Sequence, residues 1–274
     1  MSRDSRGNLR GKIVLVTGAS SGIGRELALA LAKAGCYVVA AARRLKNLES
    51  LRDEIESSAS DSGVGKVAIL SLDVSADEPA IDAAVETAWN AFGAIDVLIN
   101  NAGIRGSVKG PTELDEAEWK SVMDTNLKGP WLMSKAVGRR MQAAKRKGSI
   151  VTITSTAGLE RSLLPGASAY GSSKAGANHL TKHMALELGK DNIRVNAIAS
   201  GMFNTEITEQ LFAKTWMKKA AEKVVPIRRW GVINPDMTSL VFLLCSDYSS
   251  YITGNVFTLD GGQSLPSVPI WSSL

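Results

Sequence analysis

The sequence predicts an α/β fold with one doubly wound, seven-stranded parallel sheet. Short apolar runs rich in β-branched residues alternate with longer segments of helical periodicity, which is the pattern of repeated βα units. Each apolar run ends in Gly, Asn, Asp or Ser, as strands do where a turn follows. No linker, internal repeat or low-complexity tract divides the 274 residues into separate domains.

The order of the strands follows from the connections between them. Crossovers between parallel strands are right-handed, so the expected order is 3-2-1-4-5-6-7, with helices on both faces and ligands at the carboxyl ends of the strands. The predicted strands are Ile13–Thr17, Tyr37–Ala42, Val67–Leu72, Ile95–Asn100, Ser149–Thr154, Ile193–Ala197 and Val256–Leu259. The predicted helices are Gly22–Ala34, Leu45–Ser58, Glu78–Ala91, Glu116–Arg146, Ser168–Leu188 and Pro235–Cys245.

The domain is expected to cover residues 11–274, after a flexible N-terminus at residues 1–10. The segment from about residue 200 to 230 is too long for a simple connection, and it carries aromatic and basic side chains. We expect this irregular segment to form a lid over the substrate. Residues 263–274 would form a C-terminal tail.

The composition is that of a soluble globular protein from a reducing compartment. Cys36 and Cys245 have no spacing that indicates a disulfide framework or a metal site. The net charge of +5 favours a phosphate-bearing small molecule over nucleic acid, because no dense basic run or nucleic-acid-binding signature is present. No segment approaches the roughly 20 apolar residues of a membrane span. Neither nucleic acid nor a membrane is therefore expected as a partner.

A glycine-rich turn between the first predicted strand and helix indicates a dinucleotide site. Residues 17–24 read Thr-Gly-Ala-Ser-Ser-Gly-Ile-Gly. In a Rossmann-type arrangement, such glycines let the backbone approach a pyrophosphate at the positive end of the helix. The alternative is that they serve only tight packing of the helix against the strand. The expected cofactor contacts are Gly18, Ser20, Ser21, Gly22, Ile23 and Gly24.

The end of the second predicted strand indicates which dinucleotide binds. An NAD-selective site would have an acidic residue there to accept a hydrogen bond from the ribose 2′-hydroxyl, but this chain has Arg43 and Arg44. Arg43, assisted by Arg44 or Ser20, can instead pair with a 2′-phosphate. The sequence therefore predicts NADP(H), unless the two arginines are merely solvated residues at the start of a helix.

Polar residues also follow the third and fourth predicted strands. Asp73, with Val74 beside it, could accept a hydrogen bond from the adenine amino group. The run Asn-Asn-Ala-Gly at residues 100–103 is expected to lie under the nicotinamide ribose, with Asn100, Ala102 and Gly103 as contacts. For Asn100 the alternative is a side chain that ties neighbouring strands together.

Tyr170 and Lys174 are four residues apart in a predicted helix, so they share one face at about 40°. A phenol with a pKa of about 10 is a poor base at neutral pH. A nearby ammonium favours the phenolate, so Lys174 is expected to lower the pKa of Tyr170. This pair predicts an acid/base for hydride transfer at a carbonyl carbon.

Two more residues complete a candidate catalytic set. Ser155 follows the fifth predicted strand, where its hydroxyl could donate to the carbonyl oxygen of the substrate. Asn126 could hold a water that relays protons past Lys174. Each residue alone has an ordinary explanation, but their combination behind a glycine turn indicates catalysis.

Together these motifs resemble the short-chain dehydrogenase/reductase family, over about residues 11–262. The family's catalytic Asn, Ser, Tyr and Lys correspond to Asn126, Ser155, Tyr170 and Lys174. The resemblance implies 4-pro-S hydride transfer, with Tyr170 protonating the forming alkoxide and Lys174 also holding the nicotinamide ribose. Tyr170 and Lys174 are thus both expected to contact the cofactor. It further implies a contact of Thr205 with the nicotinamide amide, and a dimer or tetramer assembled through the two long helices.

The expected function is that of an NADPH-dependent oxidoreductase of ketones, aldehydes or 3-oxoacyl thioesters. Basic residues of the lid and of residues 145–147 could form a rim for substrates linked to coenzyme A or a carrier protein, unless they are only solvated. The chain is also similar to plant 3-oxoacyl-carrier-protein reductase-like proteins, including subunits of peroxisomal benzaldehyde synthase. The alternative is therefore an aromatic acyl-CoA reductase that needs a related partner subunit. A second alternative is a non-catalytic binding protein of the same fold.

The C-terminus carries a candidate targeting signal. Its last residues, Ser-Ser-Leu at 272–274, resemble the peroxisomal Ser-Lys-Leu signal with the lysine replaced. The sequence therefore predicts a peroxisomal location, or a cytoplasmic one if this tripeptide is not a working signal.

Overall fold

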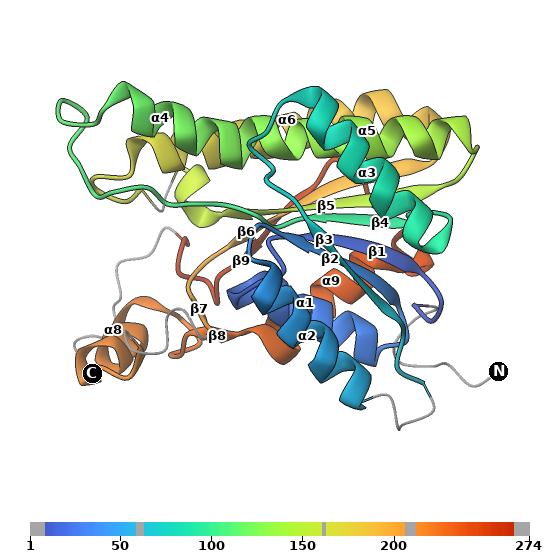
Figure 1. Cartoon of the computed structure of the whole chain (residues 1–274). Helices are drawn as coiled ribbons and strands as arrows, with labels where there is room; N and C mark the ends of the chain where they lie inside the picture. The colour runs from blue at the N-terminus through green and yellow to red at the C-terminus, as the bar shows by residue number, and fades with distance from the viewer. Residues whose placement is uncertain (1–8, 59–62, 161–162, 206–211, 266–274) are drawn as a thin grey trace.

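A seven-stranded parallel sheet lies between two layers of helices in the computed structural model, which describes residues 9–58, 63–160, 163–205 and 212–265 (Figure 1). Its order, β3-β2-β1-β4-β5-β6-β9, is the predicted one, with β9 as the seventh strand. The strands are β1 (Ile13–Thr17), β2 (Tyr37–Ala42), β3 (Val67–Ser71), β4 (Val97–Asn100), β5 (Gly148–Ser155), β6 (Ile193–Ser200) and β9 (Val256–Leu259).

The helices divide between the two faces of the sheet (Figure 1). One face carries α1 (Gly22–Lys33), α2 (Leu45–Ser57) and α9 (Thr238–Cys245). The other carries α3 (Glu78–Phe92), α4 (Glu116–Met123), α5 (Gly129–Ala143) and α6 (Ser168–Leu188). No helix of the described residues is both long enough and apolar enough to cross a membrane.

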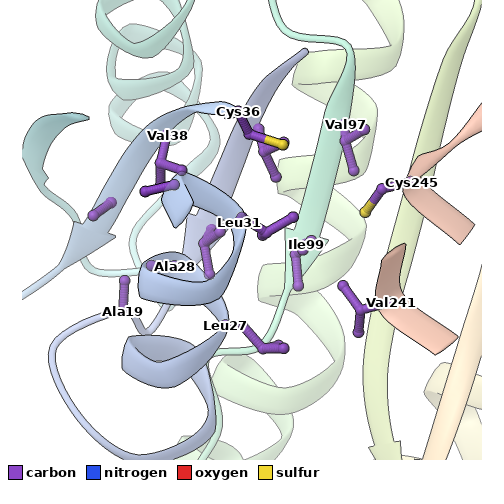
Figure 2. Close-up of a cluster of buried hydrophobic side chains, with 14 of the residues drawn as sticks. Ala19, Leu27, Ala28, Leu31, Cys36, Val38, Val97, Ile99, Val241 and Cys245 are labelled. Carbon is purple, nitrogen blue, oxygen red and sulfur yellow. The ribbon is translucent and has the colours of Figure 1, made fainter. Parts of the chain in front are cut away.

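Both faces of the sheet are buried, as a doubly wound fold requires. Alternate residues of β1 point to opposite sides: Val14 and Val16 belong to one apolar cluster and Leu15 to the other. Figure 2 shows part of the first cluster, where Leu27 and Leu31 of α1 lie near strand side chains and α9. The two clusters hold the strands in place and so define the edge where the strands end.

Both cysteines are free thiols inside the first cluster, as their spacing indicated (Figure 2). Burial raises the pKa of Cys36 to about 12, and burial also raises the pKa of Cys245. The two side chains act as small apolar groups of the core rather than as nucleophiles.

The single long helix predicted over Glu116–Arg146 is wrong. The chain forms α4, then a π-helical turn at Asp124–Lys128, and then α5, which ends at Ala143. Pro130 lacks the N–H that an unbroken α-helix would use. A Cβ on Gly129 would lie 2.7 Å from the carbonyl oxygen of Val74, so the chain approaches the loop after β3 closely here.

The lid segment is more regular than predicted. It contains β7 (Phe203–Asn204), α8 (Thr215–Val224) and β8 (Gly231–Val232), and β7 pairs with β8 in a separate two-stranded sheet. Met217 and Ala221 of α8 are buried at helical spacing, a pattern that the sequence interpretation missed. The Trp230 indole N–H donates to the Met217 carbonyl at 3.0 Å and ties the segment together.

The packed domain begins earlier than predicted, because Leu9 is 1% exposed and belongs to the core. The rest of the predicted N-terminus, residues 1–8, lies outside the described residues, as do residues 206–211 of the lid and residues 266–274. The flexible N-terminus and the C-terminal targeting signal therefore stay predictions.

Candidate active site

A cavity of about 940 Å³ opens at the carboxyl ends of the strands. The doubly wound topology brings motifs from distant parts of the sequence to this one edge. Predicted site residues that line the cavity are Gly18, Ser20, Ser21, Gly22, Ile23, Arg43, Arg44, Asp73, Val74, Ala102, Gly103, Ser155, Tyr170 and Thr205. Four others, Gly24, Asn100, Asn126 and Lys174, lie behind its wall.

The glycine turn has two roles, divided among its residues. Gly18 and Gly22 line the cavity with positive φ values of 69° and 55°, which side chains other than glycine's rarely adopt. Gly24 is not among the lining residues: a Cβ there would lie 2.3 Å from Asn101 Nδ2, so close packing requires this glycine, and its predicted cofactor contact stays a prediction. The start of α1 has no side-chain cap, and its positive end faces the cavity. The turn thus fits a dinucleotide pyrophosphate.

Arg43 and Arg44 directly follow β2 and line the cavity next to the serines of the glycine turn. Arg44 donates to Ser20 Oγ from Nη2 at 3.1 Å and also to Ser21. Arg43 is exposed, and its Nη1 lies 3.8 Å from a carboxylate oxygen of Asp73. Asp73 also accepts from Ser75, so the predicted contact of Asp73 with adenine stays a prediction. The arrangement places two guanidinium groups beside the glycine turn.

Asn100 has the structural role that was the alternative to a cofactor contact. Its side chain is 2% exposed and donates to Ser134 Oγ of α5 at 2.9 Å. Asn101, which the sequence interpretation passed over, lines the cavity instead. Its Nδ2 donates to the Thr17 carbonyl at 3.0 Å, and its backbone N–H donates to Thr17 Oγ1 at 3.0 Å. The ends of β1 and β4 are therefore locked together beneath the cavity.

Ser155 and Tyr170 both present their side chains to the cavity. Burial raises the pKa of Tyr170, while Ser155 and the guanidinium of Arg105 act in the opposite direction. The prediction that Lys174 lowers the pKa of Tyr170 is therefore not met in this structure. The phenol is protonated at neutral pH, which suits a proton donor.

The side chain of Lys174 is buried behind the wall of the cavity. It is 6% exposed, its Nζ donates to the Ile153 carbonyl at 3.1 Å, and Nζ lies 5.7 Å from the centre of the Tyr170 ring. Burial lowers the pKa of Lys174 to about 8. A Cβ on Gly103 would lie 3.4 Å from Nζ, so this cavity-lining glycine lies close to the ammonium.

Asn126, in the π-helical turn, is 1% exposed and joins two parts of the site. Its Oδ1 accepts from Ile104 N at 2.9 Å, and its Nδ2 donates to the Ile104 carbonyl at 2.8 Å and to Ser173 Oγ at 3.0 Å. Both amide N–H groups are thus used within the protein. A water relay would need an oxygen of Asn126, and it stays a prediction.

The predicted basic rim is only partly present. Residues 145–147 immediately precede β5, so they lie at the amino end of the strand, opposite the cavity. Arg146 pairs there with Asp96 at 2.6 Å, and in the lid Arg229 pairs with Asp236 at 2.5 Å. These cations are committed to structural ion pairs, which weakens the case for a carrier-binding surface.

A histidine pair on α6 stands apart from the cavity. His179 and His183 are exposed, and their Nε2 atoms lie 3.1 Å apart. Within the described part of the chain, no three His, Cys, Asp or Glu side chains gather as a metal site would require.

Comparison with known proteins places this geometry in a family. The chain matches the family model of short chain dehydrogenases over residues 12–216. It is 39% identical to the 3-oxoacyl-[acyl-carrier-protein] reductase FabG of Thermotoga maritima, over 93% of this chain and 98% of that protein. It is 36% identical to a tropinone reductase homolog of Arabidopsis thaliana, over 96% and 95% of the two chains. A solved Beutenbergia cavernae structure with bound NADP at low occupancy is similar, with a TM-score of 0.82 and 32% identity over 93% and 97% of the chains. The chain therefore belongs to the short-chain dehydrogenase family of oxidoreductases.

Proposed function

We propose that the protein is an NADPH-dependent carbonyl reductase that works without a second kind of subunit on ketones, aldehydes or 3-oxoacyl thioesters. Ser155 and Tyr170 support this most directly, because they line the same cavity as the glycine turn and the arginine pair. A non-catalytic binding protein would not need this combination. The 39% identity to a bacterial 3-oxoacyl carrier reductase supports thioesters as one substrate class.

NADPH would supply the hydride, and the chain's own residues would hold the cofactor along the cavity. Gly18 and Gly22 would face the pyrophosphate, Arg43 and Arg44 would bind the 2′-phosphate, and Gly103 would let the ribose approach Lys174. The absence of an acidic residue directly after β2 supports NADPH over NADH.

The two cavity side chains have complementary roles in reduction. Ser155 would donate to the carbonyl oxygen and hold it in place. As hydride reaches the carbonyl carbon, the Tyr170 phenol would give its proton to the oxygen, producing the alcohol and a phenolate. Because burial raises the pKa of the phenol, Tyr170 would hold the proton that reduction needs at neutral pH.

The proposal is tested by NADPH oxidation with the purified chain alone against an acetoacetyl thioester, benzoyl-CoA, benzaldehyde and a simple ketone. We expect turnover of the thioester or the ketone. No turnover of any of the four compounds, with NADPH binding intact, would exclude these substrates for the chain alone. Activity with benzoyl-CoA that appears only after a related subunit is added would favour the heteromeric aromatic acyl-CoA reductase.

The cofactor preference has its own test. Arg43→Asp is expected to shift the ratio of kcat/KM for NADPH over NADH towards NADH by about 10- to 100-fold. The new carboxylate repels a 2′-phosphate and can accept from a 2′-hydroxyl. Steady-state kinetics with both cofactors measure the ratio, and Arg139→Asp, an exposed change on α5, serves as the charge-matched control. An unchanged ratio in Arg43→Asp would disprove the role of this arginine.

A further inference from the structure

Arg105 brings a positive charge to the catalytic end of the cavity. It follows the Asn-Asn-Ala-Gly run after β4 and lines the cavity together with Ser155 and Tyr170. Its guanidinium is near enough to lower the pKa of the Tyr170 phenol, against the larger effect of burial. The charge therefore lies in the same cavity as the two proposed catalytic side chains.

The neighbouring charges already have partners. In the same loop region, Lys109 pairs with Asp115 at 2.7 Å, and Glu118 accepts from Ser107 Oγ at 2.7 Å. At the far end of the cavity, Arg43 and Arg44 are engaged by Asp73 and by the serines of the glycine turn. Among the residues that the structure describes, Arg105 has neither a hydrogen bond nor an ion pair of its side chain.

The backbone on both sides of Arg105 is held in place. Before it, Ile104 exchanges two hydrogen bonds with the buried Asn126. After it, Gly106 has a φ of 75°, and a Cβ there would lie 3.0 Å from Val122 Cγ2, so the turn packs closely on α4. Ser107 is then bound by Glu118. A cation on such a fixed loop is preorganised, and less ordering entropy is lost when it binds an anion.

Exposed apolar side chains line the same cavity as Arg105. Leu163, Leu164 and Met202 line the same cavity, and they are 74%, 49% and 38% exposed. These exposed apolar side chains indicate a surface that a ligand covers. A ligand that covers them would also exclude water and strengthen the attraction between Arg105 and an anionic group.

We propose that Arg105 forms an anion subsite that recognises a carboxylate on the carbonyl substrate, and that the substrates are therefore oxo acids with an apolar body. This rests on the proposed reductase function and narrows its substrate class. Because Arg105 shares the cavity with Tyr170 and its charge acts on the phenol, an anion bound to it would lie near the carbonyl carbon, as in a small oxo acid. A phosphate on a carrier arm would lie much farther from the reacting carbon.

The test compares 4-oxopentanoate with its neutral methyl ester, using the wild-type chain, Arg105→Gln and Arg105→Lys. We expect the wild type to prefer the acid. Arg105→Gln should lower kcat/KM for the acid by about 10- to 100-fold and change that for the ester by less than about threefold. Arg105→Lys should retain part of the preference, and Arg139→Gln, outside the cavity, should retain all of it. NADPH affinity from a fluorescence titration should be the same throughout.

Two results would overturn the subsite: a wild-type preference for the ester, or equal losses on acid and ester in Arg105→Gln. If the wild type reduces neither compound, the reductase proposal fails for this class, and calorimetric titration of the NADPH-loaded chain with 4-oxopentanoate decides the subsite separately. Binding that disappears in Arg105→Gln supports the subsite, whereas equal or absent binding in both chains contradicts it.

Discussion

Tyr170→Phe is expected to lower kcat for NADPH-dependent reduction by about 10²- to 10⁴-fold, the usual contribution of a positioned general acid. The substitution removes only the phenol oxygen, and the ring keeps its place in the wall of the cavity. NADPH affinity should therefore stay within about twofold of the wild type. Stopped-flow single-turnover kinetics measure the chemical step, and a fluorescence titration measures the cofactor affinity.

Tyr248→Phe is the matched control, because Tyr248 is 67% exposed and does not line the cavity. It should retain the wild-type rate. A wild-type rate in Tyr170→Phe would exclude Tyr170 as the proton donor. A loss of NADPH binding in that variant would mean that the phenol serves the cofactor and not the reaction.

The pH dependence of the wild-type reaction rates should also identify Tyr170 as the proton donor. Because burial raises the pKa of Tyr170, the phenol stays protonated through neutral pH. The rate of reduction should therefore change little there and fall as pH rises through that pKa, whereas oxidation of the alcohol should become faster over the same range. A reduction rate that already falls at neutral pH would show that the cofactor-bound enzyme lowers this pKa.

The strands and their order could be predicted because each strand is a continuous apolar run and right-handed crossovers leave few topologies. The break in the helix that begins at Glu116 was harder to predict, because its cause is partly tertiary. Gly129 lies against Val74, a contact between segments far apart in the sequence. The helix α8 in the lid was hard to predict, because its apolar face is short and basic residues lie between the apolar ones.

In the candidate site, too, some residues could be placed from the sequence and others could not. Ser155 and Tyr170 could be placed because one ends a strand and the other lies in a helix whose first turn meets the same edge. Asn100 and Asn101 are chemically identical neighbours, and only the direction of each side chain decides that Asn101 lines the cavity. The burial of Lys174 and the nearness of Arg105 to Tyr170 depend on how loops pack, so the electrostatics of the phenol were not predictable from spacing.

Lys174→Met is expected to stop most of the reduction activity while making the folded chain more stable. Lys174 is 6% exposed, and burial lowers its pKa from 10.5 to about 8. At neutral pH the folded state must hold a buried ammonium, whereas the unfolded state holds a solvated one. Removing that charge should raise the free energy of unfolding by about 1–3 kcal/mol, after allowance for the lost hydrogen bond to Ile153.

The pH dependence of that gain identifies its cause. A lysine with a lowered pKa in the folded state destabilises it fully below about pH 8, and this penalty disappears as pH rises towards 10.5. Urea unfolding of wild type and variant should therefore show a difference that is largest at neutral pH and shrinks across this window. Lys46→Met, at an exposed position of α2, should change stability by less than about 0.5 kcal/mol at every pH. A variant less stable than the wild type at neutral pH, or a gain that does not vary with pH, would show that the ammonium carries no burial penalty. The expected outcome, loss of activity with gain of stability, would mean that the fold retains this charge for the reaction at the cavity.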